Sequence, residues 1–384
     1  MSCLRKLPSR QWQRYASFIL LMGFSGVVSS QTAPASIQPK ADQSLIIDIE
    51  KTDNGYIAVG ERGHILYSEN GENFKQVAVP VNQMLNGVSF ADSLNGWAVG
   101  FDGHIVASSD GGKTWRLQRN GLISQQEKNV RSLAKYNAEE INLQKKLAST
   151  AITDDEKSVL VTQLDDVQWE IDSLKDSMAD EITTPPLLDV WFQDRNVGWA
   201  VGAFGVALKT IDGGESWQDI SEQLNNDMGF HLNAVQGFSN GVVVIVGEAG
   251  FVVTSNNGGE TFKTSDLGYE GTLFGLDADH SGKTIVTTGL RGKTFVSQDQ
   301  GQTWQNVSPQ VGFSLSGVEF LSEGTFLLVG HGGTLAFTED SGMSYKILTL
   351  PSRIAVSNAV KSNQDGFVLV GQGGIHTLKA SKLQ

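Results

Sequence analysis

Several side chains have the types that cleavage of a glycosidic bond to an acidic sugar would require. That chemistry uses arginines to bind the sugar carboxylate, a tyrosine nucleophile with an acidic partner, and a separate acid catalyst. The chain offers Arg62, Arg291, Arg353, Tyr269, Glu248 and Asp102. Tyr269 and Glu270 are neighbours in sequence, however, which is a poor geometry for a proton relay. Hydrolysis is therefore the alternative hypothesis, and we assign no catalytic residue.

An acidic motif repeats six times along the chain. Each copy has a hydroxyl residue, an acidic or amide residue, one or two glycines and then an aromatic residue. The aromatics are Phe74, Trp115, Trp217, Phe262, Trp304 and Tyr345. They are 41 to 45 residues apart, except for one interval of 102 residues. A period near forty with one interruption indicates a repeat architecture.

The acids of this motif could bind calcium or could stabilise turns. A calcium loop of the EF-hand kind needs oxygen ligands at alternate positions and a distal glutamate, which the copies lack. A turn needs an acceptor for its own N–H groups, followed by a glycine. The candidate acceptors are Asp110, Asp212, Asn257, Asp299 and Asp340. Asn257 stands where other copies have aspartate, so the motif keeps a hydrogen-bond acceptor but not the charge. We therefore predict that these motifs stabilise turns and do not bind calcium.

No cofactor or metal is predicted from the remaining side chains. His64 and His104 occupy equivalent positions in neighbouring repeats, but two ligands are too few for a zinc site. The chain has 29 Lys+Arg against 42 Asp+Glu and a formal net charge of -13, which disfavours nucleic-acid binding. The only cysteine, Cys3, lies in an N-terminal segment that resembles a secretion signal. A chain cleaved after that segment would contain no thiol and no disulfide.

The repeat itself predicts an all-β fold. One unit reads LNGVSF, GWAVG, GHIVASS, a DGG turn and a run from Trp115, which is typical of four antiparallel strands. Units begin near Leu45, Leu85, Leu187, Leu232, Leu273, Leu315 and Ile354. Four-stranded sheets of this size need neighbours on both faces, so we predict a seven-bladed β-propeller. The last unit has three strands, and we expect residues 36–44 to pair as its missing outer strand.

The long interval predicts an inserted antiparallel α-helical hairpin. Residues 124–148 and 154–181 lose the strand pattern. The second segment has a heptad seam made of Leu160, Leu164, Val167, Ile171, Leu174 and Met178. Thr153 and Glu156 form a capping box at its start, and Pro185 with Pro186 prevents its continuation. The first segment is basic and the second acidic, so we expect their charges to be complementary.

These elements divide the chain into five parts. Residues 1–30 read as a signal peptide, because basic residues precede an apolar run that ends at Ser29 and Ser30. Residues 31–44 are the N-terminal segment with the expected closing strand. Residues 45–121 hold blades 1 and 2, residues 122–184 the helical hairpin, and residues 185–384 blades 3–7. The signal predicts the periplasm or another extracytoplasmic compartment.

The repeated turns are similar to the Asp-box, or BNR, repeat of sialidases, xyloglucanases and sortilin-type receptors. The continuous run GWAVGFDGHIVASSDGGKTW more narrowly resembles the photosystem II stability/assembly factor family of seven-bladed propellers. The resemblance covers residues 45–378 apart from the insertion, which departs from the family's simple pattern. It implies a non-catalytic, monomeric, protein-binding propeller that assists assembly or stability of a membrane protein complex. In a non-photosynthetic host, the resemblance implies an envelope complex such as an RND-type exporter.

One face of the propeller is predicted to bind the partner. The hairpins between second and third strands must share a face with the connections between blades and with the insertion. Arg62 and Arg291, followed by Arg353 and Arg119, are scarce cations there that suit a partner's carboxylates. Phe204, Tyr269 and the hairpin's Trp169 complete the candidates. Each arginine could instead pair with a neighbouring acid, and Trp169 could pack on the propeller.

Two enzymatic or glycan-binding alternatives stay open at this point. A sialidase-like glycoside hydrolase would carry an arginine-containing motif at its first repeat, where this chain has LIIDIEK. A xyloglucanase would need two propellers. A lectin-like propeller could use Phe101, Phe204 and Tyr269, and composition does not separate glycan binding from protein binding.

Overall fold

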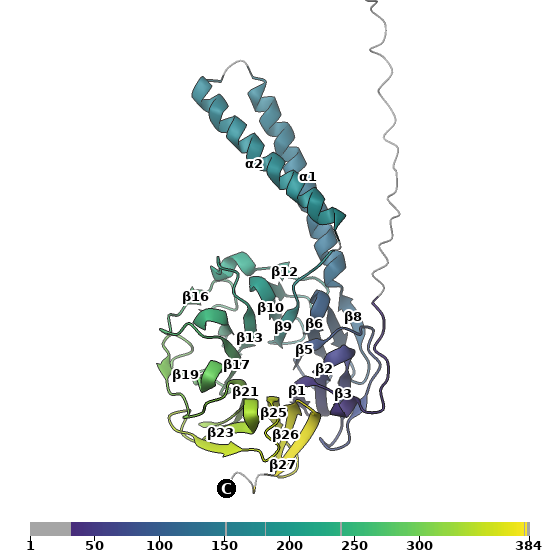
Figure 1. Ribbon diagram of the computed structural model, residues 1–384, viewed down its shortest axis with the longest axis vertical. Coiled ribbons are helices and arrows are strands. Elements are labelled where there is room, and N and C mark those ends of the chain that lie inside the picture. The colour runs from purple at the N-terminus through teal and green to yellow at the C-terminus, as the bar shows by residue number, and fades with distance from the viewer. Residues whose placement is uncertain (1–31, 150–151, 181, 239, 380, 382–384) are drawn as a thin grey trace, which may run out of the picture. The chain divides into compact units, whose positions relative to one another are not determined.

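Seven β-sheets form the propeller in the computed structural model, which describes residues 32–149, 152–180, 182–238, 240–379 and 381 (Figure 1). The predicted signal peptide, residues 1–30, lies outside the described residues. The seven-bladed, all-β prediction is confirmed. Among the described residues, no helix combines the length and apolarity that a membrane span requires.

Six blades have four antiparallel strands, and the strand order follows the sequence. Blade 1 holds β1 (Ile46–Thr52), β2 (Gly55–Gly60), β3 (Ile65–Ser68) and β4 (Lys75–Gln76). Blade 2 holds β5 (Leu85–Phe90), β6 (Gly96–Gly100), β7 (Ile105–Ser108) and β8 (Arg116–Arg119). Blade 3 holds β9 (Leu187–Phe192), β10 (Gly198–Gly202), β11 (Ala207–Thr210) and β12 (Gln218–Asp219).

The remaining blades follow after the helical insertion. Blade 4 holds β13 (Leu232–Gly237), β14 (Val243–Gly247), β15 (Val252–Ser255) and β16 (Lys263–Thr264). Blade 5 holds β17 (Leu273–Ala278), β18 (Ile285–Gly289), β19 (Thr294–Ser297) and β20 (Gln305–Asn306). Blade 6 holds β21 (Leu315–Ser322), β22 (Thr325–Gly330), β23 (Thr334–Thr338) and β24 (Lys346–Thr349). Blade 7 holds only β25 (Val356–Lys361), β26 (Gly366–Gly371) and β27 (Gly374–Lys379).

The first strand of each blade lies innermost and lines a central cavity of about 450 Å³. Carboxylates on these strands hold neighbouring blades together. Asp48 accepts a hydrogen bond from the backbone N–H of Val88 (2.9 Å) and Asp189 accepts one from Val235 (2.8 Å). Asp277, further along its strand, accepts one from Phe320 of the next blade (2.6 Å). Burial, with a smaller contribution from the Asp48 charge, raises the pKa of Asp189 to about 8.

The repeated acidic motif forms the turn between the third and fourth strands. In blade 2, the Ser108 hydroxyl accepts from the N–H of Gly112 (2.9 Å). Asp110 accepts from the N–H of Thr114 through one oxygen (2.9 Å) and from its hydroxyl through the other (2.6 Å). Equivalent bonds involve Asp212, Asn257, Asp299 and Asp340. In Asp212, these hydrogen bonds, led by that of the Ser216 hydroxyl, lower the pKa to about 2.

The predicted closing strand at residues 36–44 is wrong. Ala41–Gln43 form a short 3-10 helix, η1, and the preceding residues run along the outer edge of blade 1. There, the N–H of Ala35 donates to the carbonyl of Val79 (3.0 Å) and the N–H of Gln38 donates to the side chain of Gln76 (2.7 Å). Pro39 has no N–H to donate to a ladder, which weakens strand pairing at this point.

The insertion forms two long helices, α1 (Gly121–Leu147) and α2 (Asp154–Ala179). The capping box between Thr153 and Glu156 is present. Leu143 of α1 packs with Val167 and Ile171 of α2, and half-buried neighbours, including Leu160 and Leu164, extend this seam. No ion pair among the described residues joins α1 to α2, so their opposite net charges form no direct contact. The apolar seam and a hydrogen bond from the Gln168 amide to the Glu140 carboxylate (3.0 Å) hold the two helices together.

Candidate partner-binding face

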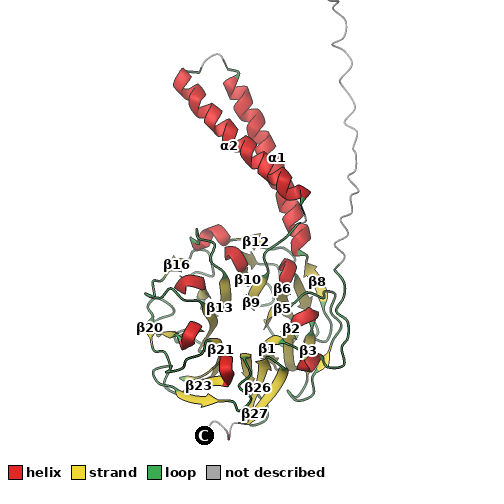
Figure 2. Ribbon diagram, viewed as in Figure 1, coloured by secondary structure: helices red, strands yellow, loops and turns green. Residues whose placement is uncertain are grey.

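Six short helical turns join the second and third strands of blades 1–6 and form a ring on one face (Figure 2). They are η2 (Glu61–Gly63), η3 (Phe101–Gly103), η4 (Ala203–Gly205), η6 (Glu248–Gly250), η7 (Leu290–Gly292) and η8 (His331–Gly333). Each turn is bonded to the connection that enters its blade. For example, the N–H of Leu290 donates to the carbonyl of Thr272 and that of His331 donates to Ser314 (both 2.9 Å). Turns and connections therefore form one surface, which we call the turn face.

The middle residue of these turns has a left-handed backbone conformation. Its φ is 52° to 57° in Arg62, Asp102, Phe204, Ala249 and Arg291, whereas the turn of blade 6 has Gly332 there. A residue with a Cβ atom loses roughly 1–2 kcal/mol in this conformation. The next residue is glycine in each turn. At Gly250, for instance, a Cβ would collide with the carbonyl of Tyr269.

The turn face carries three exposed arginines, Arg62, Arg291 and Arg353. None of them forms an ion pair with another described residue, although the chain as a whole is acidic. Arg353 also has a left-handed backbone, with φ of 50°. The alternative that neighbouring acids pair with these side chains is therefore not supported among the described residues.

Arg291 and Arg353 belong to one part of the turn face, over blades 5 and 6. The N–H of Arg291 donates to the Ser314 hydroxyl (3.3 Å). The Phe313 ring lies beside Gly332, and the backbone of Arg353 lies beside Gly333. We define the blade 5–6 patch as Leu290, Arg291, Phe313, His331 and Arg353. Its Phe313 is 49% exposed and its Leu290 39%, so the patch combines apolar and cationic groups.

The blade 5–6 patch lies at the mouth of the central cavity. Leu290, Ser314 and His331 line both the turn face and that cavity, together with Asp48 and Asp189 of the inner strands. Sequence reasoning did not select Phe313. Its signal was the run VGFS between two blades, which places an aromatic residue two positions before the first strand of blade 6, as Phe230 is placed before the first strand of blade 4.

Arg119 has a different environment from the other arginines. It is half-buried, its guanidinium donates to the carbonyl of Gly103 in η3, and burial lowers its pKa. The next residue, Asn120, caps α1 by accepting from the N–H groups of Leu122 and Ile123. Lys128 of α1 forms an ion pair with Asp219 of blade 3 (3.0 Å). These contacts attach the hairpin to blades 2 and 3. Arg119 therefore helps to hold the base of α1 on the propeller.

The aromatic candidates divide into exposed and packed residues. Phe204 is 69% exposed, with its ring edge-on to that of His231 (4.9 Å between centroids). Trp169 on α2 is 68% exposed and so does not pack on the propeller. Tyr269 is half-buried, and its hydroxyl donates to the carbonyl of Leu290 (3.3 Å). Burial raises the pKa of Tyr269, which makes its oxygen a poorer nucleophile at neutral pH.

The histidines do not form a metal site. His64 and His104 are buried beneath η2 and η3, and burial lowers the pKa of each. Within the described ranges, no group of three or more histidine, cysteine, aspartate or glutamate side chains could hold a metal ion.

A family model described as photosynthesis system II assembly factor YCF48 matches residues 66–148 and 161–312, more than half of the chain. The chain belongs to this family. A YCF48-family relative, the photosystem II assembly protein Ycf48 of Thermosynechococcus vestitus, is 22% identical over an alignment of 214 residues, and the match covers 44% of this chain and 61% of the relative. The chloroplast photosystem II stability/assembly factor HCF136 of Arabidopsis thaliana is 26% identical over an alignment of 175 residues, and the match covers 40% of this chain and 42% of the relative.

A solved YCF48 structure has the same fold. It has a TM-score of 0.58 and 15% identity, and the match covers 88% of this chain and 94% of the other; it is described as YCF48 bound to D1 peptide. The chain thus spans 61% and 42% of the length of the two curated relatives. It is a propeller like the photosystem II assembly factors, and the membership predicted from the sequence is confirmed.

Proposed function

We propose that this chain is a non-catalytic, extracytoplasmic propeller that binds a membrane protein through its turn face and assists the assembly or stability of that protein's complex. The observation that carries the proposal is the display of Arg62, Arg291 and Arg353. These arginines have left-handed backbones, are exposed, and form no ion pair with any described residue. Backbone strain at positions where glycine would be easier is typical of functional surfaces.

The chemistry of the turn face favours an extended segment with carboxylate groups. Guanidinium groups bind carboxylates through paired hydrogen bonds, and the apolar Leu290 and Phe313 beside Arg291 would cover the aliphatic part of such a segment. The YCF48 structure bound to a D1 peptide supports peptide recognition by this fold. For a host without a photosystem, we propose an envelope complex such as an RND-type exporter as the partner.

A non-catalytic role is supported by the environment of Tyr269. A tyrosine nucleophile needs an activating acid, whereas this hydroxyl donates to a backbone carbonyl and its pKa is raised by burial. We place the protein in the periplasm or another extracytoplasmic compartment because residues 1–30 have the pattern of a signal peptide. The absence of thiols after Cys3 is compatible with an oxidising compartment.

Affinity capture from native membranes tests the proposal. Tagged protein is incubated with detergent-solubilised membranes, and captured proteins are identified by mass spectrometry. The wild type should retain a membrane protein that Arg291→Glu and Arg353→Glu variants lose. A matched control is Arg116→Glu, since Arg116 lies on β8 and pairs with Glu215 outside the turn face. Equal capture by all variants, or robust sialoside hydrolysis lost in Tyr269→Phe, would contradict the proposal.

A further inference from the structure

The interface between blades 6 and 7 differs from the other six interfaces. In those six, the aromatic residue that ends a turn motif packs in the cluster shared with the preceding blade. These residues are Phe74, Trp115, Trp217, Phe262, Trp304 and Tyr345. The cluster shared by blades 6 and 7 contains no such residue among those described.

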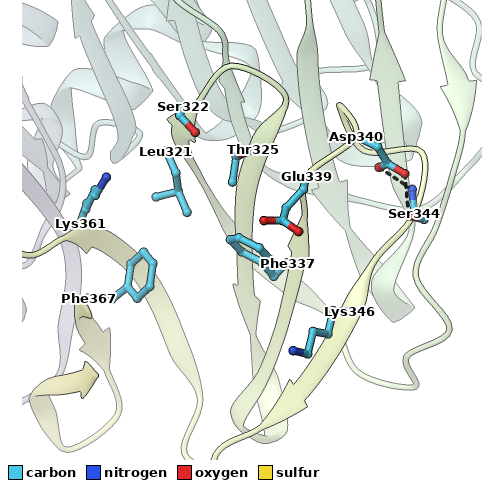
Figure 3. A pocket seen from close by; sticks show the side chains of 10 residues that line it. All are labelled: Leu321, Ser322, Thr325, Phe337, Glu339, Asp340, Ser344, Lys346, Lys361 and Phe367. Carbon is cyan, nitrogen blue, oxygen red and sulfur yellow. Dashed lines mark hydrogen bonds between the residues drawn. The ribbon is translucent and has the colours of Figure 1, made fainter. Parts of the chain in front are cut away.

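A cavity of about 670 Å³ lies at this interface. Figure 3 shows Leu321 and Phe337 of blade 6 and Phe367 and Lys361 of blade 7 around it. The strand register shows which position the cavity corresponds to. Phe337 pairs with Leu327 as Tyr67 pairs with Ile57 in blade 1.

In the interface between blades 1 and 2, Ile57 and Tyr67 belong to the same cluster as Trp115. Phe337 is therefore the counterpart of a residue that shares an apolar cluster with a motif aromatic in another interface. A volume of 670 Å³ is ample for an indole ring and the backbone that carries it. The cavity corresponds to the aromatic position of the repeat.

In blade 7, no strand formed by the described residues pairs with the outer edge of β27. Its sheet order is β25-β26-β27, whereas in each other sheet a further strand follows the motif aromatic. In blade 2 that strand pairs Arg116 with Ala107 and Leu117 with Val106. The corresponding residues of β27 are Thr377 and His376. An unpaired edge of this kind accepts an extended segment through backbone hydrogen bonds.

We propose that the cavity and the β27 edge together bind an extended segment of a partner protein that carries an aromatic side chain. The aromatic ring enters beside Phe337 and Phe367, and the residues after it pair with β27. The short helix η1 (Ala41–Gln43) lies beside the Gly374 end of β27, and residues 32–44, to which it belongs, contain no aromatic residue. The cavity is lined by Asp340 and Ser344 of the blade 6 turn motif and by no residue of the turn face. The proposed site is therefore separate from the turn face and goes beyond the function proposed for it.

Charge narrows the expected sequence of the segment. In the interface between blades 1 and 2, the Lys113 ammonium lies over the Tyr67 ring, 5.8 Å from its centroid. Lys113 comes two residues before Trp115. In the blade 6–7 cavity, the counterpart of Tyr67 is Phe337, and Glu339 lines the same cavity. A basic residue two positions before the aromatic would therefore meet both a ring and a carboxylate.

The chain's own repeat supplies a probe for this site. A fluorescently labelled peptide with the sequence of residues 108–118, SSDGGKTWRLQ, is titrated with the protein and followed by anisotropy. We expect saturable binding, at least 10-fold weaker for a peptide with alanine in place of its tryptophan. Phe337→Ala should weaken binding similarly. Lys361→Trp, which fills the cavity from blade 7, should abolish binding, and thermal melts check that each variant is folded.

Tyr67→Ala is the matched control, because its ring lies at an interface that Trp115 already fills. It should leave the affinity for the peptide unchanged, as should Arg291→Glu on the turn face. The proposal is overturned if about 1 mM protein binds no peptide, or if the alanine peptide binds equally. It is also overturned if Tyr67→Ala weakens binding as Phe337→Ala does, or if the protein forms a dimer that Lys361→Trp dissociates. Capture of a membrane protein by the turn-face variants tests the proposed function and does not depend on this peptide assay.

Discussion

Replacing Arg291 by glycine should separate the stability of the fold from the binding of a partner. Arg291 has a φ of 56°, and Gly332 occupies the equivalent position in blade 6. Relief of the left-handed strain is worth roughly 1–2 kcal/mol. Glycine also destabilises the folded state by about 0.4–1 kcal/mol, because it raises the conformational entropy of the unfolded chain. The free energy of unfolding of Arg291→Gly should therefore be about 0.5–1 kcal/mol higher than that of Arg291→Ala, because alanine keeps the left-handed strain.

Binding should change in the opposite direction. A hydrogen bond to a charged group contributes about 1.5–3 kcal/mol, so both variants should weaken partner binding roughly 10- to 150-fold. Stability is measured by urea unfolding, and affinity by capture of the membrane protein over a series of protein concentrations. If Arg291→Gly is less stable than the wild type by more than about 1 kcal/mol, the arginine side chain packs on the fold and the display argument fails. Unchanged affinity in both variants would refute the assignment of Arg291 to the partner.

Three further predictions concern other parts of the chain. The pKa of Asp189 in the folded protein, about 8, lies above its ordinary value. Its contribution to stability is therefore fully present below about pH 4 and is lost as the pH rises towards 8. The melting temperature of Asp189→Asn should depend less on pH over this range than that of the wild type. Trp169→Ala should reduce partner capture without changing the melting temperature, because the side chain is 68% exposed, and a large loss of stability would show that it packs. Asp299→Ala should cost about 1 kcal/mol in urea unfolding because the turn loses its acceptor, whereas Asn257→Asp keeps the acceptor and should change stability by less than about 0.5 kcal/mol.

The repeat made most of the fold predictable. Strand starts such as Leu85, Leu187 and Leu232 agree with the sequence-based units because each unit must place the same apolar residues between neighbouring sheets. The capping box at Thr153 was equally readable, since its two hydrogen bonds need only local residues. The path of residues 36–44 was not, because it depends on competition between two sheet edges and a proline.

The candidate site was predictable in part. Arg62 and Arg291 could be placed on the turn face from the position of their GxxG stretches. The buried environment of Arg119 could not be foreseen, because it arises where α1 meets η3, and that contact joins a repeat to an insertion. The complementary net charges of the two helices did not predict their direct contacts, since net charge does not specify which side chains face each other. The inter-blade carboxylates, such as Asp48, were missed because their partners lie on the neighbouring blade.

Site-specific photo-crosslinking from the turn face tests the central claim most directly. A photoreactive phenylalanine analogue is introduced at Arg291 and, as the matched control, at Ser216 in the turn motif of blade 3, which is also exposed. Both proteins are then irradiated with native membranes. The account predicts a crosslink to a membrane protein from position 291 and none from position 216. A crosslink from position 216 alone would contradict it.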